Sequence, residues 1–340
     1  MAFGALTPAV PLPGCRICTL AIDAEEDFDW DSPIRGTSNS TSHMRNVRVL
    51  ETILGAYGIV PTYLLTFPVL EDADVVRIIR RQLDRGTCAV GIQLHPWVTP
   101  PFNEAPSHRV SFPGNLDTDL EERKLIALKA KFIECFGHAP TAYRAGRYGL
   151  GEHTPLLLEK HGFAIDTSIA PRTSFTAEGG PDHTGYDCNL FWFGKERRLL
   201  EVPLCRSIVG WAGQYAPMLY RALARSSSPS GLLSILARLR CAERITFSPE
   251  GNDVPAMRRL ARGLVARNQA VLALSFHSSS LQVGRNPYVQ SKAELHAFYD
   301  RLSAILDHLA SGLSFRFAGL AQLPDFLAQP GPPAPCPPAQ

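Results

Sequence analysis

The residues with the clearest chemical potential form an acidic run, DAEEDFDW, directly after an apolar segment. Its five carboxylates fall within seven positions: Asp23, Glu25, Glu26, Asp27 and Asp29. Such crowding raises carboxyl pKa values unless a cation lies among the groups, which is the usual reason to assemble them. In an extended chain Asp23, Glu25 and Asp27 point to the same side. We therefore expect this run to supply a general base and ligands for a cation.

Two histidines also stand where apolar, strand-like segments end. GIQLHPWV places Gln93, His95 and Trp97 at alternate positions, and LALSFHSSSL ends an apolar run at His277. His95 either binds a cation or bonds a backbone carbonyl, and a facing carboxylate cluster favours the first. His277 is either functional or a satisfied core histidine. His43, soon after the acidic run, is a further candidate ligand.

A third segment, YRAGRYG, carries two arginines around small residues. One guanidinium of Arg144 or Arg147 can reach back toward the acidic run while the glycines let the loop turn tightly. For Arg147 a surface ion pair is the alternative.

The elements that must position these residues alternate between apolar strand-like and amphipathic helical segments. Strands are expected over 15–23, 59–67, 88–94, 141–146, 163–168, 199–204, 270–277 and 313–320. Helices are expected over 43–58, 72–86, 119–136, 151–161, 214–239, 253–268 and 291–311. About seven βα units without a dinucleotide fingerprint predict an α/β fold, a deformed (β/α) barrel of about seven parallel strands. In such a barrel the chemistry collects at the carboxyl ends of the strands, where all four polar clusters lie.

Composition predicts a globular protein, large enough for one large domain or two ordinary ones, with a local rather than a global charge pattern. The 340 residues are 45% hydrophobic, and 34 basic against 32 acidic residues leave a net charge of +2. We expect one catalytic domain over 15–328, an N-terminal segment over 1–14 and a disordered proline-rich tail over 329–340. Without a block of Lys and Arg, no nucleic acid or membrane surface is expected as a partner.

The cysteines and the N-terminus predict a cytoplasmic location. Eight cysteines are scattered along the chain, and we interpret them as free thiols in a reducing compartment. Cys15 and Cys18 have the spacing of a redox or zinc pair, but no second pair follows. The proline-broken N-terminus does not read as a signal peptide, and no apolar run reaches membrane length.

Taken in order, these motifs resemble those of the polysaccharide deacetylase (NodB-homology) family, and their variants are similar to its WalW-like branch. The motifs that carry the resemblance are DAEEDFDW, QLHPWVTPPF, YRAGRYG, ERITFSPEG and SFHSSSL. It extends from about Cys18 to about Leu327.

The resemblance implies a metal-dependent hydrolase that removes acetyl groups from an N- or O-acetylated saccharide, a carbohydrate esterase type acting on carbon–nitrogen bonds other than peptide bonds. Asp23 matches the general base and Glu25 falls nearest the acidic metal ligand. Arg144 matches the arginine that orients the base, and His277 matches the general acid. The implied cofactor is a divalent metal, zinc first, with manganese or cobalt also acceptable.

One departure concerns the metal ligands. The family motif sets two histidines four residues apart, and aligning Gly91 with its glycine puts Gln93 and Trp97 at those positions. His95 lies between them. Either His95 is the nitrogen ligand beside Asp23 and Glu25, with His43 as a possible addition, or metal binding is weakened or lost.

The expected partner is an acetylated saccharide or a small amide. Gln93 and Arg147 are expected to contact the substrate, and Trp97, Trp30 and Tyr148 offer flat surfaces that stack on sugar rings, with core or rim packing as the alternative.

Three other functions stay open. One is hydrolysis of a non-sugar amide, and another is a degenerate metal-free barrel that binds a glycan. The third is a metal-independent glycosidase, for which Glu201 is the only candidate for a second carboxylate.

Overall fold

The computed structural model describes residues 6–27, 39–196, 198–210, 215 and 241–328. All but Tyr215 of the helix expected over 214–239 lies outside these described residues, as does the proline-rich tail over 329–340. Asp29 and Trp30 also lie outside them.

The strands and helices of the described residues follow the alternation expected from the sequence. The strands are β1 (Thr7–Pro8), β2 (Ile17–Ala24), β3 (Thr62–Leu65), β4 (Ala89–Leu94), β5 (Ala142–Ala145), β6 (Ile165–Asp166), β7 (Phe191–Phe193), β8 (Leu199–Glu201), β9 (Arg206–Val209), β10 (Glu243–Thr246), β11 (Val271–His277) and β12 (Arg316–Phe317). The helices are α1 (Val47–Gly55), α2 (Phe67–Glu71), α3 (Ala73–Asp84), α4 (Thr118–Phe136), α5 (Thr154–Lys160), α8 (Val254–Val265) and α9 (Lys292–Asp307). Strands β1, β7, β9 and β10 are not among those expected from the sequence, because they are too short or too irregular to give a periodic pattern.

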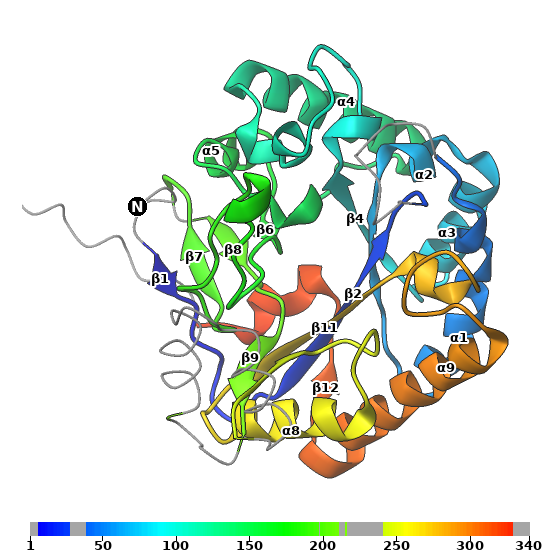
Figure 1. Cartoon of the computed structure of the whole chain (residues 1–340), viewed down its shortest axis with the longest axis vertical. Coiled ribbons are helices and arrows are strands. Elements are labelled where there is room, and N and C mark those ends of the chain that lie inside the picture. Colours follow the sequence, from blue (N-terminus) through cyan, green and yellow to red (C-terminus); the bar gives the residue numbers. More distant parts are fainter. Residues whose placement is uncertain (1–5, 28–38, 197, 211–214, 216–240, 329–340) are drawn as a thin grey trace, which may run out of the picture.

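The central sheet is mostly parallel, with helices around its outside (Figure 1). Parallel pairing joins β8, β6, β5, β4, β3, β2 and β11 in that order, and β12 also pairs parallel to β2. Antiparallel pairing adds β7 to β8 and β1 to β7. The predicted α/β fold with about seven parallel strands is confirmed.

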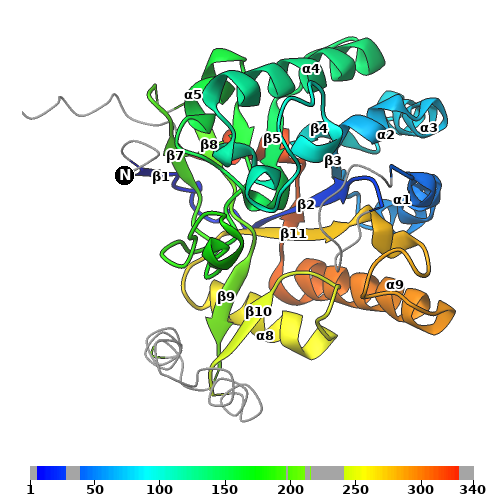
Figure 2. The same ribbon diagram turned by 45° about the horizontal axis from the view of Figure 1, so that its top comes forward.

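The barrel is deformed because no strand ladder of the described residues closes the sheet from β11 back to β8. Strands β9 and β10 form a separate two-stranded ribbon in the turned view of Figure 2. Single backbone bonds bridge the gap: Phe247 N donates to Cys205 O at 2.7 Å, and Ser275 N donates to Phe247 O at 3.3 Å. The ribbon therefore forms part of the wall beside β11.

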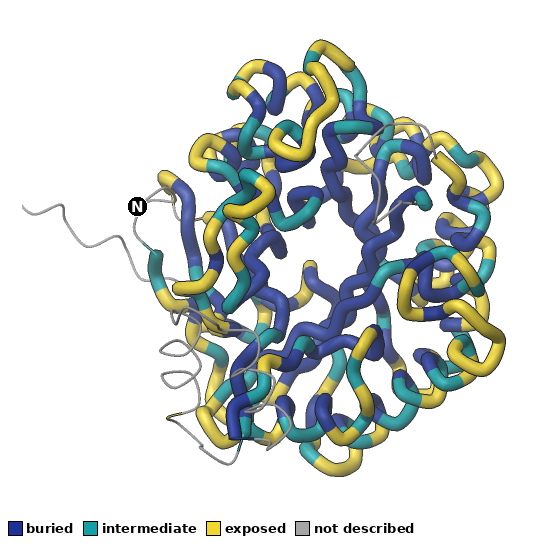
Figure 3. The backbone as a smooth tube through the Cα atoms, in the orientation of Figure 1, coloured by how far each residue is buried: buried dark blue, intermediate teal, exposed yellow. Residues whose placement is uncertain are grey.

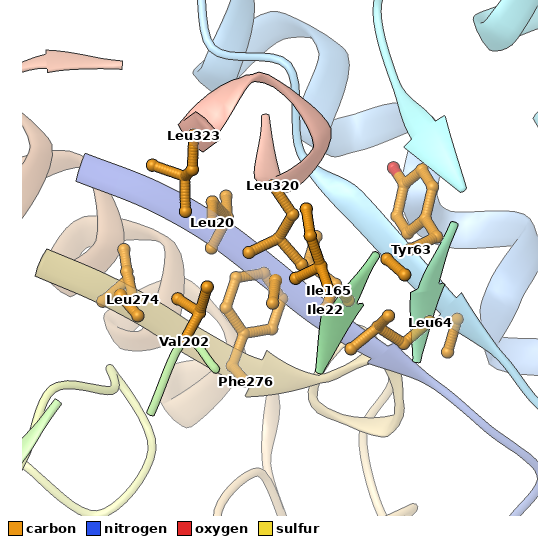
Figure 4. Close-up of a cluster of buried hydrophobic side chains, with 14 of the residues drawn as sticks. Leu20, Ile22, Tyr63, Leu64, Ile165, Val202, Leu274, Phe276, Leu320 and Leu323 are labelled. Atoms are coloured by element: carbon orange, nitrogen blue, oxygen red, sulfur yellow. The ribbon is translucent and has the colours of Figure 1, made fainter. Parts of the chain in front are cut away.

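The core follows the two central strands. All eight residues of β2 are buried, and Figure 3 shows the buried residues along the inner strands and the exposed ones on the outer helices. Leu20 and Ile22 of β2 lie beside Leu274 and Phe276 of β11 in the apolar cluster of Figure 4. Burying such side chains stabilises the fold by about 1.5–3 kcal/mol each.

Caps define the ends of the outer helices. The Asp72 carboxylate accepts hydrogen bonds from the backbone N–H of Asp74 and Val75 at the start of α3, and Asp117 accepts one from Leu120 at the start of α4. Helix α4 ends at Gly137, whose φ of 77° suits a residue without a Cβ.

Each of the seven cysteines among the described residues is a free thiol. Burial raises the pKa of Cys18, within β2, to about 12, so this thiol does not react readily. No described helix is both long and apolar enough to span a membrane.

Lys124 of α4 fixes the loop that follows β4. Its side chain is fully buried, and Nζ donates to the carbonyl oxygens of Pro96 at 3.0 Å, Thr99 at 2.7 Å and Pro101 at 2.7 Å. The carboxylate of Glu104 lies 2.8 Å from the same nitrogen. One ammonium group therefore hydrogen-bonds to three carbonyls of the loop and forms an ion pair with its carboxylate.

We predict that Lys124→Met destabilises the protein, because it leaves three carbonyls and one carboxylate without their buried donor. The free energy of unfolding should fall by about 3–5 kcal/mol, measured by urea denaturation. Lys131→Met on the same helix is the control: Lys131 pairs with Glu134, which is largely exposed, and should cost less than about 1 kcal/mol. Equal losses in the two variants would contradict the role given to Lys124.

Candidate active site

Asp23 and Arg144 form a buried ion pair at the centre of the site. Both side chains are about 1% exposed, and Arg144 Nη1 donates to Asp23 Oδ1. Nη1 also donates to Ser275 Oγ at 3.2 Å, while Nε and Nη2 donate to the carbonyl and hydroxyl of Thr167, each at 3.0 Å. Burial lowers the pKa of Arg144, but the charge of Asp23 outweighs it and the pKa is raised. All three guanidinium nitrogens are thus held in place, and with them the carboxylate.

His277 lies beside Asp23 because β11 and β2 pair in register, with these two residues opposite one another. His277 Nε2 is 3.7 Å from Asp23 Oδ2. The sequence analysis placed both residues at strand ends, and the structure brings them together on neighbouring strands.

Glu250 holds the other side of the His277 ring. Its Oε2 is 2.8 Å from His277 Nδ1, and its Oε1 accepts hydrogen bonds from His277 N at 2.9 Å and Ser280 Oγ at 2.5 Å. Burial lowers the pKa of His277, but Glu250, with Glu25 and Asp23, outweighs it and raises the pKa to about 10. At neutral pH this ring is a charged imidazolium, able to donate a proton.

Glu250 is a functional candidate to which the sequence analysis gave no role. It lies in ERITFSPEG, one of the motifs that carry the family resemblance, a few residues after β10 ends. The signal that could have identified Glu250 is a carboxylate soon after the end of a strand. Because β10 is only four residues long, that strand was not recognised.

His95 faces Glu26 as well as Glu25. Glu26 Oε1 is 2.8 Å from His95 Nδ1 and accepts a hydrogen bond from Trp97 Nε1 at 3.1 Å. The rings of His95 and Trp97 stack with centroids 4.2 Å apart. Glu26 has the opposite parity to Asp23 and Glu25 along the chain, but its carboxylate is buried and fixes both rings.

The turn after β5 packs closely on His95. A Cβ added at Gly146 would lie 2.5 Å from Leu94 O and 2.7 Å from His95 Cδ2, so only glycine fits there. The tight turn expected in the RAGR segment is present, and it closes over the histidine.

Compared with Asp23, Glu26 and Glu250, the carboxylate of Glu25 has more distant partners. Its Oε2 lies 3.4 Å from Gln93 Nε2 and 3.5 Å from His95 Nε2. Gln93 Nε2 is itself 3.0 Å from His95 Nε2, which fits a ring whose Nδ1–H points to Glu26 and whose Nε2 accepts from the amide. Burial raises the pKa of Glu25 to about 7.

The three residues expected to ligate a metal do not form a complete ligand set. No group of three His, Cys, Asp or Glu side chains among the described residues is arranged to hold an ion. Asp23 faces Arg144 and His277, so only Glu25 Oε2 and His95 Nε2 remain as neighbouring donors, 3.5 Å apart. These residues do not fit the implied divalent metal.

Both ring nitrogens of His43, the further candidate ligand, have hydrogen-bond partners. Nδ1 is 3.1 Å from Asp27 Oδ1 and Nε2 is 2.9 Å from Ser278 Oγ, while Arg285 donates to Asp27 Oδ2 at 2.8 Å. The order Asp, His, Ser matches a nucleophilic triad. However, His43 and Ser278 are fully buried, and Ser278 Oγ also accepts from Glu25 N at 3.3 Å. The array therefore ties the end of β2 to the segment after β11.

Arg147 points to a surface ion pair, the alternative considered for it. It donates to Ser111 Oγ at 2.7 Å, pairs with Glu178, and lies over the Phe112 ring at 4.4 Å. Its neighbour Tyr148 is at the site instead, 5.7 Å from the guanidinium of Arg144.

A cavity of about 280 Å³ opens beside His277. Its lining includes Glu250, Tyr148, Tyr288 and Arg206, of which only Tyr148 was expected from the sequence to lie at the site. The His277 side chain is 18% exposed, whereas Asp23 behind it is 2% exposed. The size is near the lower end of small-molecule sites.

We predict that Glu26→Gln destabilises the protein, because a neutral amide replaces the charged acceptor of two buried N–H groups. The free energy of unfolding should fall by about 1–3 kcal/mol in urea denaturation. No loss of stability would contradict the role of Glu26.

Glu25→Gln is the matched comparison and should behave differently with pH. Because the native pKa of Glu25 is raised to about 7 from 4.5, its contribution to stability is full below pH 4.5 and is lost as pH rises through 7. Glu25→Gln should remove that loss and cost less than Glu26→Gln near neutral pH. Identical pH profiles of wild type and Glu25→Gln would contradict the raised pKa.

Comparison with known proteins finds likeness in structure alone. The sequence matches no known protein-family profile and no curated protein. A solved structure from Mycobacterium smegmatis, described as a candidate polysaccharide deacetylase, is 19% identical with a TM-score of 0.50 and 94% of each chain covered. A family 4 acetyl xylan esterase from Clostridium thermocellum, solved with a cobalt ion, is 10% identical (TM-score 0.42; 91% of this chain and 90% of that chain covered). A CE4 family pseudoenzyme from Bacillus anthracis is 7% identical (TM-score 0.44; 92% and 66% covered). Only the first likeness bears on the fold, and at 19% identity it shows that this chain shares the fold of that protein.

Proposed function

We propose that this chain is a hydrolase that removes acetyl groups from an N- or O-acetylated saccharide. The observation that carries the proposal is the pairing of a carboxylate and an imidazolium at 3.7 Å, Asp23 with His277, beside a cavity. At that separation the two groups are not directly hydrogen-bonded, and a reacting water beside the pair can hydrogen-bond to both. The motif order supports the polysaccharide deacetylase family and its WalW-like branch.

In this mechanism Asp23 is the general base and His277 the general acid. Asp23 Oδ2 takes a proton from water as the water oxygen bonds to the acetyl carbonyl carbon. His277 Nε2 gives its proton to the sugar nitrogen or oxygen as the bond to the acetyl carbon breaks. The products are acetate and a free sugar amine or hydroxyl. Arg144 orients Asp23, and Glu250 orients and charges His277.

The positive charge of His277 also favours the tetrahedral intermediate. The oxyanion formed on the acetyl carbonyl would develop next to His277, which lines the cavity, and charge stabilisation in a buried site is usually the largest contribution to such a reaction. Tyr148 and Tyr288 line the cavity and present aromatic surface to a sugar ring.

The structure weighs against a glycosidase. Glu201, the candidate for a second carboxylate, is fully buried, and its Oε1 accepts a hydrogen bond from Ile169 N at 2.9 Å. Its partner across β6 and β8 is Asp166, which is also fully buried, so neither carboxyl group faces the cavity. Acetate release from a panel of N- and O-acetylated sugars and small amides would separate deacetylation from hydrolysis of a non-sugar amide.

We predict that Asp23→Asn lowers kcat for acetate release by about 10²- to 10⁴-fold, because the amide cannot accept the proton of the water. Asp74→Asn is the matched control: it makes the same substitution in the exposed first turn of α3, where Asp74 pairs with Arg77, and should leave kcat unchanged. A folded Asp23→Asn variant with normal turnover would contradict the role of Asp23.

We predict that Glu250→Gln shifts the alkaline limb of the kcat/KM profile to lower pH. Glu250 raises the pKa of His277 to about 10, so the variant loses the protonated acid at a lower pH than wild type. Glu243→Gln alters an ion pair between Glu243 of β10 and Arg259 of α8, and it should leave the profile unchanged. A shift of the acidic limb instead would mean that His277 acts as a base.

A further inference from the structure

Arg206 is a charged group in the cavity that the reaction above does not use. It begins β9 and lines the cavity together with His277, Glu250 and Tyr148. The guanidinium is partly buried. Among the described residues no carboxylate lies within ion-pair distance of it.

Two threonine hydroxyls hold the guanidinium in place. Nε donates to Thr246 Oγ1 at 2.7 Å, and Thr246 is the register partner of Arg206 on β10. Nη1 donates to Thr173 Oγ1. These acceptors are neutral, so they orient the guanidinium without compensating its charge, and Nη2 has no hydrogen-bond acceptor among the described residues.

The other charges of the cavity wall compensate one another. Three charged side chains line it among the described residues, and two of them, His277 and Glu250, are in contact at 2.8 Å. Arg206 is left as an excess positive charge. The exposed Arg244 nearby adds to this positive charge. Burial and the charge of Arg244 both lower the pKa of Arg206. An uncompensated guanidinium is costly unless an anion joins it, and its planar donors match carboxylate, sulfate and phosphate groups.

We propose that Arg206 binds an anionic group of the substrate, so that the preferred substrate is an acidic acetylated saccharide that carries a carboxylate, sulfate or phosphate near its acetyl group. This rests on the proposed deacetylase function, which places the acetyl group at His277. Arg206 is then a specificity residue, and a neutral acetylated sugar lacks its main anchor.

The test measures binding without catalysis, using sugars that have no acetyl group. Glucuronate, glucose 6-phosphate and glucose are titrated into the full chain by calorimetry, with Arg206→Gln, Arg206→Lys and Arg244→Gln as variants. Wild type should bind the anionic sugars more tightly than glucose, and Arg206→Gln should lose about 10- to 100-fold in affinity for them alone. The two anions distinguish a carboxylate from a phosphate preference.

Arg244→Gln is the matched control, because it removes a nearby exposed charge and should change affinity far less. Arg206→Lys keeps the charge and should retain part of the preference, and added salt should weaken binding of the anionic sugars to wild type but not of glucose. The Arg206→Lys titration and the salt dependence of wild type test the inference even if Arg206→Gln fails to fold.

Equal affinity of wild type for all three sugars, or an unchanged preference in Arg206→Gln, would overturn the inference. Failure of the deacetylase proposal gives a different result, namely no acetate release from any acetylated sugar, with the anion preference intact. In a turnover assay on paired acidic and neutral acetylated sugars, Arg206→Gln should raise KM for the acidic one with little change in kcat.

Discussion

The buried ion pair of Asp23 and Arg144 is the interaction on which the site depends. Removing two charges from water costs several kcal/mol per ion, and the attraction offsets this only when hydrogen bonds satisfy the remaining donors. Thr167 and Ser275 supply those bonds from neighbouring elements. The geometry of β2, β5 and β11 at their carboxyl ends is therefore linked through one guanidinium.

Charge balance explains how the barrel tolerates its acidic run. Three buried carboxylates of the site each contact a basic side chain, in the pairs Asp23 with Arg144, Glu26 with His95, and Glu250 with His277. Glu25 has more distant contacts, with Gln93 Nε2 at 3.4 Å and His95 Nε2 at 3.5 Å, and burial raises its pKa. The crowding that suggested a bound cation is relieved to a large extent by basic side chains of the chain itself, which is consistent with the absence of a three-residue ligand set among the described residues.

The ribbon of β9 and β10 supplies residues of the cavity wall that the parallel strands do not. It interrupts the regular parallel pairing between β8 and β11 and carries Arg206 and Thr246 into the wall of the cavity. Glu250 follows β10 within a few residues and reaches His277. The parallel strands therefore supply the candidate acid and base, and the irregular segment supplies both the orienting carboxylate and the excess positive charge.

The sequence by itself determined the βα order, the mostly parallel sheet and the strand-end positions of Asp23, His95, Arg144 and His277, because long apolar strands and amphipathic helices leave periodic patterns. It also showed that His95 lies between Gln93 and Trp97 after the third strand. Only the tertiary structure decided the pairings: that β11 lies next to β2, that Glu26 faces His95, and that Arg147 turns to the surface. Partners of this kind are set by register and by contacts between residues far apart in the chain, and side-chain parity within one segment does not contain that information.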